Sequence, residues 1–298
     1  MLIPQSLKDS IYQVIFFLRD AFNSFASILK FRGSSYDGQL DNGNILVRLN
    51  RATLLGEKGQ LIQITPDSGL KKKMFMHAVH EPEVSEFLVK SINGSKSQVP
   101  IYVDVGANVG LIARQVLRNL EKPVIAHLVE PIQIYCEACS YNLSDLVSHK
   151  ISISKFALGN EDDDSLFIDL RNRGNTTYYK KLAGNNFYEE KCEFKKTSDF
   201  FSSIENTYDI FLKIDTQGLD AQILSKIPLN IWARIRGLVV EVWAHDQIIS
   251  DEVEFVCERL REMSISFDSN FENPLLINDL FDFWKSKSFE HRDLYCYR

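Results

Sequence analysis

The 298-residue sequence lacks several features that mark whole classes of protein. It has no basic surplus, because 34 lysines and arginines stand against 40 acidic residues and give a formal net charge of −6. Condensation on a phosphate backbone is therefore not favoured, and nucleic acid is not expected as a partner. Five cysteines are an odd number and too few for a disulfide scaffold, which indicates a reducing compartment, the cytoplasm.

Long hydrophobic runs are also missing. The most apolar N-terminal run, IYQVIFFL, is followed by Arg19 and Asp20 and is far too short to cross a bilayer. Residues 6–31 carry apolar side chains at helical spacing and predict an amphipathic helix. Its polar face has no lysine and arginine stripe, so packing on the main domain or a homodimer seam is favoured over peripheral association with a membrane, which stays open.

Metal-binding patterns are weak. The CxxC of Cys136 and Cys139 has no second CxxC and no neighbouring histidine, which favours two buried residues one helical turn apart over a metal or redox site. His77 and His80 form an HxxH that could in principle join acidic residues at strand ends. The same spacing occurs at helix ends without metal, so no metal is expected.

The pattern of the chain changes near residue 80. Before it, turn sequences such as DNGN and TPDSG surround the short β-like runs NILVRL and QLIQIT, which predict a small β element. A helix is predicted over 81–92, with Pro82 in its first turn. We therefore divide the chain into an N-terminal extension, 1–79, and a main domain, 80–298.

In the main domain, strands alternate with helices, which is typical of a parallel sheet covered on both faces. The predicted helices are GLIARQVLRNL, IQIYCEACSYNL, GLDAQILSKI and DEVEFVCERLREM. The predicted strands are IYVDV, VIAHLVEP, HKISISKFAL, the edge strand SLFIDL, DIFLKID, RGLVVEVWA, SISFDS and DLYCYR.

The stretch IYVDVGANVG, residues 101–110, joins the first of these strands to a glycine-rich turn. Gly106 and Gly110 permit a tight turn and close approach to a ligand, and Asn108 tolerates a left-handed conformation. The turn is not the dinucleotide fingerprint, because Asn108 stands at its second glycine and Leu111 at its third, and no GK[ST] follows.

Charge narrows the choice of ligand. Asp104 at the strand end would repel a pyrophosphate and favour an ammonium or sulfonium cation, and S-adenosylmethionine carries both cations and no phosphate. Glu130, about 20 residues beyond the turn, is placed to accept hydrogen bonds from two ribose hydroxyls. Asp104 could instead stabilise a turn, and Glu130 could be a plain surface residue. Together, their spacing favours an adenosyl ligand.

The motifs VDVGANVG, VEP, HEPEVSEFL, FALGNEDD, LKIDTQGLDAQIL and VVEVW resemble the FkbM-type family of S-adenosylmethionine-dependent methyltransferases. The resemblance covers the main domain, residues 80–298, and no motif of the family is evident before it. It implies a Rossmann-like class I methyltransferase fold: a mostly parallel seven-stranded sheet, its last strand antiparallel, with helices on both faces. It also implies O-methylation of hydroxyl groups, often on sugars or other natural products.

The loop and the matched motifs give the expected cofactor-binding residues: Asp104, Gly106, Asn108, Gly110, Glu130, Pro131, Ala157 and Asp215. The resemblance also marks Gln217 and Gly218. Gln217 stands where many relatives have glutamate, which weakens any role that needs charge at this position.

Methyl transfer from a sulfonium is an in-line displacement, and a hydroxyl acceptor benefits from a general base. Asp215 follows the strand beside the first one and is the first choice for the acceptor side, with helix capping as its alternative. His245, after VVEVWA, is a second candidate base or a structural histidine. Glu241 is expected to anchor Lys213 across the sheet.

Residues 171–194 are rich in Asn, Gly, Thr and Tyr and too long for a simple connector, which favours a loop over the site mouth, although a surface excursion is equally consistent. Asn175, Thr176 and Tyr178, together with Gln217, are the expected substrate-binding residues.

The leading hypothesis is therefore an enzyme, an S-adenosylmethionine-dependent O-methyltransferase acting on a small-molecule or glycan acceptor. An N-methyltransferase is the first alternative, because a neutral amine needs less help from a base. A nicotinamide-dependent oxidoreductase and a catalytically silent binding module that assembles through its N-terminal helix are the others. The intact Asp104, Glu130 and Asp215 argue against the silent module.

Overall fold

The computed structural model describes residues 33–65, 68–159, 165–169, 176–178, 187–205, 207–244, 250–286, 288 and 290–298. The predicted helix at 6–31, and with it the homodimer seam, lies outside these residues. Within the described ranges, no helix combines the length and the apolar character that a membrane crossing requires.

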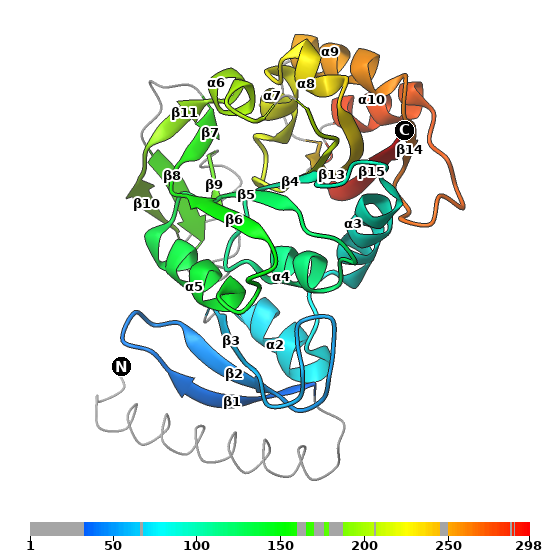
Figure 1. Ribbon diagram of the computed structural model, residues 1–298. Coiled ribbons are helices and arrows are strands. Elements are labelled where there is room, and N and C mark those ends of the chain that lie inside the picture. The colour runs from blue at the N-terminus through cyan, green and yellow to red at the C-terminus, as the bar shows by residue number, and fades with distance from the viewer. Residues whose placement is uncertain are drawn as a thin grey trace, which may run out of the picture.

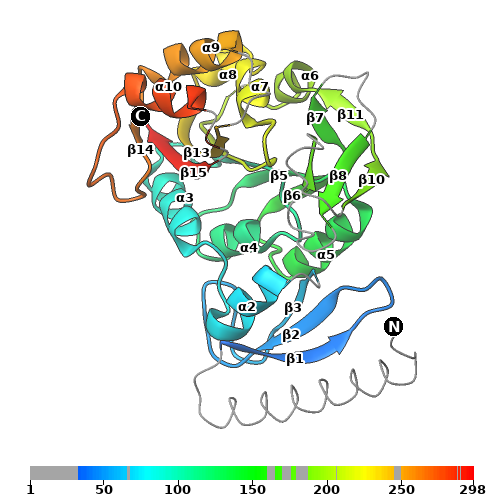
Figure 2. The same cartoon turned by 180° about the vertical axis from the view of Figure 1, so that it is seen from behind.

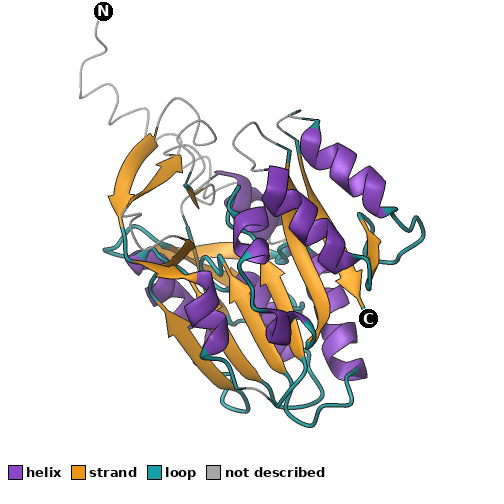
Figure 3. Ribbon diagram, turned by 90° about the horizontal axis from the view of Figure 1, so that it is seen from above, coloured by secondary structure: helices purple, strands orange, loops and turns teal. Residues whose placement is uncertain are grey.

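A seven-stranded sheet forms the centre of the molecule (Figures 1 and 3). Among its described strands, β15 alone runs in the direction opposite to the other six. This order and direction are those of the class I methyltransferase fold, which confirms the predicted fold class. The strands, in spatial order, are β14 (Ser264–Ser266), β15 (His291–Tyr297), β13 (Ile235–Trp243), β12 (Ile210–Ile214), β4 (Ile101–Val105), β5 (Ile125–Val129) and β6 (Lys150–Ser154).

Helices cover both faces of the sheet, as predicted (Figure 1). On one face lie α3 (Pro82–Gly94), α4 (Leu111–Arg118) and α5 (Gln133–Leu143). On the other face lie α6 (Thr197–Ser202), α7 (Asp220–Ser225), α8 (Leu229–Trp232), α9 (Ser250–Leu260) and α10 (Ile277–Lys285). All five residues of β4 are buried, because a parallel strand between two helical layers has no exposed face.

The small β element is a three-stranded antiparallel sheet: β1 (Ser34–Gln39), β2 (Ile45–Leu49) and β3 (Leu61–Ile64). Strands β2 and β3 lie in the two predicted runs. β1 was not predicted, because it contains Asp37-Gly38, a pair typical of turns; a register shift between Tyr36 and Gly38 accommodates it within the strand.

This β element packs beside the glycine-rich turn and is not a separate body. Figures 1 and 2 show it, with α2 (Ser68–His77), against α4 and α5. Its buried Val47 and Ile62 share one apolar cluster with Val109 and Tyr135 of the main domain. The buried Asn142 of α5 joins the two parts, because its amide accepts from the backbone N of Gln63 and donates to the backbone O of Gln63, both at 2.8 Å.

The predicted edge strand SLFIDL does not belong to the central sheet. It forms β8 (Ser165–Asp169), which pairs with β10 (Phe187–Lys191) and β9 (Thr176–Thr177) in a separate three-stranded sheet. A third pairing joins β7 (Ala157–Gly159) to β11 (Phe194–Lys196). β8 forms five residue pairs with β10, which provide backbone hydrogen-bond partners along one of its edges. Its backbone groups on this edge therefore do not need partners from the central sheet.

Candidate active site

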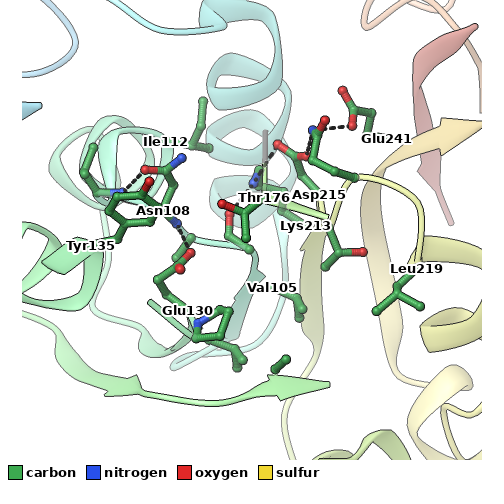
Figure 4. A pocket seen from close by; sticks show the side chains of 18 of the residues that line it. Val105, Asn108, Ile112, Glu130, Tyr135, Thr176, Lys213, Asp215, Leu219 and Glu241 are labelled. Carbon is green, nitrogen blue, oxygen red and sulfur yellow. Dashed lines mark hydrogen bonds and ion pairs between the residues drawn. The ribbon is translucent and has the colours of Figure 1, made fainter. Parts of the chain in front are cut away.

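A cavity of about 470 Å³ opens at the carboxyl ends of β4, β5, β12 and β13 (Figure 4). In a sheet of this kind ligands bind at this edge, beside the point where the strand order reverses. The cavity has a loop end, formed by the turn after β4 and the end of β5, and an acidic end, formed by residues that follow β12 and end β13. We use these two names below.

At the loop end, backbone conformation explains the glycines. Gly106 has φ +78°, and a Cβ on it would lie 1.9 Å from the backbone O of Asp215. A side chain there would therefore push the turn off the end of β12. Gly110 has φ +76°, and a Cβ on it would lie 2.6 Å from Cys139 Sγ. Asn108 has φ +50°, the left-handed conformation that its residue type favours.

Glu130 is fixed by the same turn. Its Oε2 accepts from the backbone N of Asn108 at 2.8 Å, and its Oε1 accepts from the backbone N of Ile132 at 2.9 Å. The residue lines the cavity and is 4% exposed, and burial raises the pKa of Glu130 to about 7. A carboxylate has about four acceptor sites, so two remain for ligand hydroxyls. Pro131 and Ala157 line the cavity beside it.

Asp104 lies elsewhere than the sequence suggested. Its side chain is fully buried and is not part of the cavity wall. Its Oδ1 lies 3.2 Å from Lys213 Nζ, and its Oδ2 accepts from the Tyr102 hydroxyl at 3.0 Å. The reason is register: Asp104 is paired with Lys213 on the adjacent β12, so the two charges meet beneath the turn. Asp104 is therefore not placed to contact a cofactor bound in the cavity.

Asp215 instead brings negative charge to the cavity beside the turn. Its Oδ2 lies 3.5 Å from Lys213 Nζ, and its Oδ1 accepts from Gln217 Nε2 at 2.7 Å. Burial alone would raise the pKa of Asp215. The Lys213 ammonium and the Gln217 amide lower it by more than burial raises it, so the pKa of Asp215 lies below its usual range. The carboxylate of Asp220, the first residue of α7, holds the loop after Asp215, because it accepts from the backbone N of Thr216 at 2.9 Å and of Gly218 at 3.0 Å.

Glu241 does not anchor Lys213, contrary to the sequence-based expectation. Its Oε2 accepts from Gln217 Nε2 and from Trp243 Nε1, each at 2.6 Å. The Gln217 amide therefore bridges Asp215 and Glu241, as Figure 4 shows. Burial, with the nearby Asp215 carboxylate, raises the pKa of Glu241 well above its usual range. A neutral amide satisfies both carboxylates, which gives glutamine at position 217 a role that needs no charge.

The structure adds His80 and Glu81 to the cavity wall. The backbone N of His80 donates to Gln115 Oε1 at 2.9 Å, and Gln115 Nε2 donates back to the backbone O of His80 at 2.6 Å. Left-handed Ala78 (φ +55°) and Glu81 (φ +43°) flank the histidine. Burial lowers the pKa of His80, which keeps the imidazole neutral near pH 7. The HEPE motif was the signal in the sequence for this position.

The remaining predicted residues separate into three groups. Thr176 lines the cavity, and Thr177 Oγ1 donates to the backbone O of Gln217 at 2.6 Å, which ties β9 to the acidic end. Tyr178 packs against Phe194, with ring centroids 6.1 Å apart, and does not line the cavity. Asn175 and His245 lie outside the described residues. In the part of the chain that the structure describes, no cluster of three His, Cys, Asp or Glu residues could hold a metal ion.

Neither the protein-family models nor the curated proteins that were compared with the chain give a match. Distant solved structures do. One is the SAM-dependent methyltransferase from Agrobacterium tumefaciens, 12% identical over 90% of this chain and 77% of that chain, with a TM-score of 0.39. Another is precorrin-6y C5,15-methyltransferase from Geobacter metallireducens GS-15, 11% identical over 72% of this chain and 84% of that chain, with a TM-score of 0.33.

The bifunctional kinase-methyltransferase WbdD is 7% identical over 78% of this chain, with a TM-score of 0.42, and the chain spans 44% of WbdD. At such identities and scores these likenesses are too remote to assign an activity. The class I methyltransferase fold therefore rests on the strand order of this chain itself.

Proposed function

We propose that the protein is an S-adenosylmethionine-dependent methyltransferase that methylates a hydroxyl group of a sugar, glycan or related natural product. The observation that carries the proposal is one cavity with two chemically different ends. A buried carboxylate at the loop end has acceptor sites left for ribose hydroxyls, and an ionised carboxylate stands beside the turn.

The loop end would hold the adenosine. Glu130 would accept from the ribose hydroxyls, and its position is fixed by the backbone N–H groups of Asn108 and Ile132. Phe156, Ala157 and Leu158 give the cavity an apolar wall on the same side, which suits an adenine ring. Gly106 would let the backbone approach the ligand, and Pro131 follows Glu130 on the wall. Gly110 does not line the cavity and instead lets the turn pack against Cys139.

The charge of the cavity supports a sulfonium cofactor over a nicotinamide dinucleotide. Its wall carries the ionised Asp215, while Lys213 already pairs with two carboxylates and Lys73 pairs with Glu81. A pyrophosphate would be repelled there, and a cation would be favoured. Asp215 would supply the negative charge near the sulfonium and the ammonium that the sequence assigned to Asp104.

Two features support a hydroxyl acceptor. Carboxylates at the acidic end can accept hydrogen bonds from hydroxyls and take up a proton, which an alcohol acceptor requires. The aromatic Trp243 in the same wall suits the face of a sugar ring. Gln217, Thr176 and Asn175 remain the proposed acceptor-binding residues, and His245 remains a candidate base. Tyr178, which does not line the cavity, is no longer proposed for this role. The FkbM-type motifs favour the same acceptor class.

Isothermal titration calorimetry tests the cofactor. We expect S-adenosylmethionine and S-adenosylhomocysteine to bind at micromolar concentration and NAD not to bind. Glu130→Ala should abolish the binding, and Glu258→Gln, an exposed change on α9, should leave it unaltered. Tight NAD binding without a response to either adenosyl compound would overturn the proposal in favour of an oxidoreductase.

The acceptor class needs a second experiment. The protein is incubated with methyl-tritiated S-adenosylmethionine and matched panels of sugars, glycans and amines, and the products are separated by mass. Label on sugar hydroxyls supports the proposal, whereas label confined to amines supports an N-methyltransferase. Cofactor binding without methylation of any acceptor would favour a silent binding module.

A further inference from the structure

A chain of side-chain contacts leads from Asp215 through Gln217 and Glu241 to His291 of β15. Trp243 of β13 is directly opposite His291 of β15, and their rings stack with centroids 4.4 Å apart at 20°. Glu241 lies two residues before Trp243 and therefore on the same face of β13. Its Oε1 lies 3.5 Å from His291 Nε2, while its Oε2 is held by Gln217 and Trp243.

The two oxygens of Glu241 thus have different surroundings. Oε2 accepts two donors at 2.6 Å, which fixes the orientation of the carboxyl group. Among the hydrogen bonds of the described residues, Oε1 takes part in none, and it faces the imidazole of His291. The side chain of Glu241 is 13% exposed and that of His291 is 53% exposed, and both line the cavity. The pair therefore connects the cavity to solvent.

We propose that Glu241 accepts the proton of the acceptor hydroxyl and that His291 passes this proton to water. The inference rests on the proposed methyl transfer. The hydroxyl oxygen bonds to the methyl carbon, and the carbon–sulfur bond breaks with its electron pair moving to sulfur. The hydroxyl proton moves to Glu241 Oε1, then to His291 Nε2 and from there to solvent. Atoms and charge balance without any further reactant.

Asp215 is the weaker base of the bridged pair. Lys213 lies 3.5 Å from Asp215 and favours its ionised form, whereas burial and the Asp215 charge disfavour the ionised form of Glu241. A bound sulfonium cation would favour ionised Glu241 until the methyl group leaves. Methyl transfer turns the sulfonium into a neutral thioether in the same step that releases the hydroxyl proton. The proton affinity of Glu241 rises when the cation is lost, so Glu241 would take up this proton.

An acceptor-free test compares two cofactor analogues. Sinefungin carries an amine on carbon where the cofactor carries its sulfonium methyl, and S-adenosylhomocysteine carries nothing there. We expect the wild-type protein to bind sinefungin about tenfold more tightly, since its ammonium would face ionised Glu241. Glu241→Gln should reduce this ratio to about twofold and leave the affinity for S-adenosylhomocysteine within about twofold. Glu258→Gln is the matched control and should keep the ratio.

A second measurement tests the contact with His291 in the complex with sinefungin. The imidazole ¹⁵N signals are recorded by NMR, with His291→Gln assigning those of His291. We expect Glu241→Gln to move the Nε2 signal of His291, because it removes the carboxyl group that faces this nitrogen, and to leave the signals of His149 unchanged. The other charged or titratable groups around the pair are Asp215, Lys213, Asp220, Asp293, Glu81, Lys73 and His80, and all stay in place in this variant.

The outcomes separate the two levels of the argument. If wild-type protein binds neither analogue, the proposed function falls, and the proton path falls with it. Binding of both analogues with a ratio that Glu241→Gln does not change would overturn the role of Glu241 alone. An unmoved His291 Nε2 signal in a folded Glu241→Gln protein would overturn the transfer from Glu241 to His291. A reduced sinefungin preference together with a moved His291 Nε2 signal supports the proposal.

Discussion

The two ends of the cavity are built in different ways. The loop end comes from two segments close together in the chain, the turn after β4 and the end of β5, and its shape depends on backbone conformation. The acidic end collects Asp215, which follows β12, Glu241 of β13 and His291 of β15, and its shape depends on how these three strands pair. Changes at the loop end should therefore act on cofactor binding, and changes at the acidic end on charge balance and acceptor chemistry.

Gly106→Ala should have the largest effect. The added Cβ would overlap the backbone O of Asp215, and alanine disfavours φ +78°. We expect affinity for S-adenosylhomocysteine to fall more than about 100-fold and the free energy of unfolding to fall by about 2 kcal/mol or more. Calorimetry and urea denaturation measure the two effects.

The matched control is Gly38→Ala on β1, where an added Cβ meets nothing within 4 Å. It should change neither the affinity nor the stability appreciably. Equal behaviour of the two alanine variants would contradict the account of the loop end.

Gln217→Glu should have the next largest effect, and at the acidic end. It places a third carboxyl group between Asp215 and Glu241, in a backbone conformation (φ +54°) that glutamine and glutamate tolerate alike. The neighbouring carboxyl groups would raise the pKa of the new carboxyl group in the folded protein above its value in the unfolded chain. The variant therefore keeps its stability below the unfolded-state pKa and loses stability as the pH rises through the folded-state pKa.

We expect Gln217→Glu to lower the free energy of unfolding by about 1–3 kcal/mol near pH 8, and by less near pH 5. Gln39→Glu, an exposed change on β1, should show no such pH dependence. If Gln217→Glu keeps its affinity for S-adenosylhomocysteine, the acidic end acts independently of cofactor binding at the loop end. If the variant loses this affinity, the two ends are coupled.

Glu130 gives a smaller effect that depends on pH. Its folded-state pKa of about 7 lies above the ordinary 4.5, so its contribution to the stability of the ligand-free protein is full below about pH 4.5 and is lost as pH rises through 7. Ribose hydroxyls bind the ionised form more strongly. We expect the affinity for S-adenosylhomocysteine to rise severalfold between about pH 6 and pH 8.

Glu130→Gln should weaken binding about tenfold near pH 8 and remove most of this pH dependence, because the amide does not ionise. Calorimetry at both pH values measures it. An unaltered pH profile in the variant would assign the titration to another group.

The sequence predicts the loop end better than the acidic end for a physical reason. β4 is apolar except for Asp104 and is followed directly by Gly106. The turn and Glu130 come shortly after it in the chain, so local pattern determines their positions. The orientation of Asp104 could not be predicted, because its burial depends on pairing of β4 with β12. His291 could not be predicted at the site either, because it reaches Glu241 through the antiparallel pairing of β13 with β15.

The same distinction holds for the fold. The seven strands of the central sheet overlap the predicted runs, since buried parallel strands have strong apolar patterns, although β13 and β15 begin at Ile235 and His291, before their runs. β8 was placed in the wrong sheet, because a five-residue strand does not encode which edge it pairs with. α10 was not predicted although Leu280 and Trp284, four residues apart, are buried at helical spacing, so the signal was present in the sequence.

Trp243→Phe should have the smallest effect and sharpens the account of the acidic end. Phenylalanine keeps a ring against His291 but removes the indole N–H that donates to Glu241 Oε2 at 2.6 Å. We expect the free energy of unfolding to fall by about 1 kcal/mol and affinity for S-adenosylhomocysteine to stay within about twofold. Trp232→Phe also loses an indole hydrogen bond, to the backbone O of Leu224, but at 2% exposure it leaves a core void and should cost more. If Trp243→Phe weakened the binding of S-adenosylhomocysteine as strongly as Glu130→Gln, the acidic end would contact the cofactor itself, and the division of the cavity into two ends would be wrong.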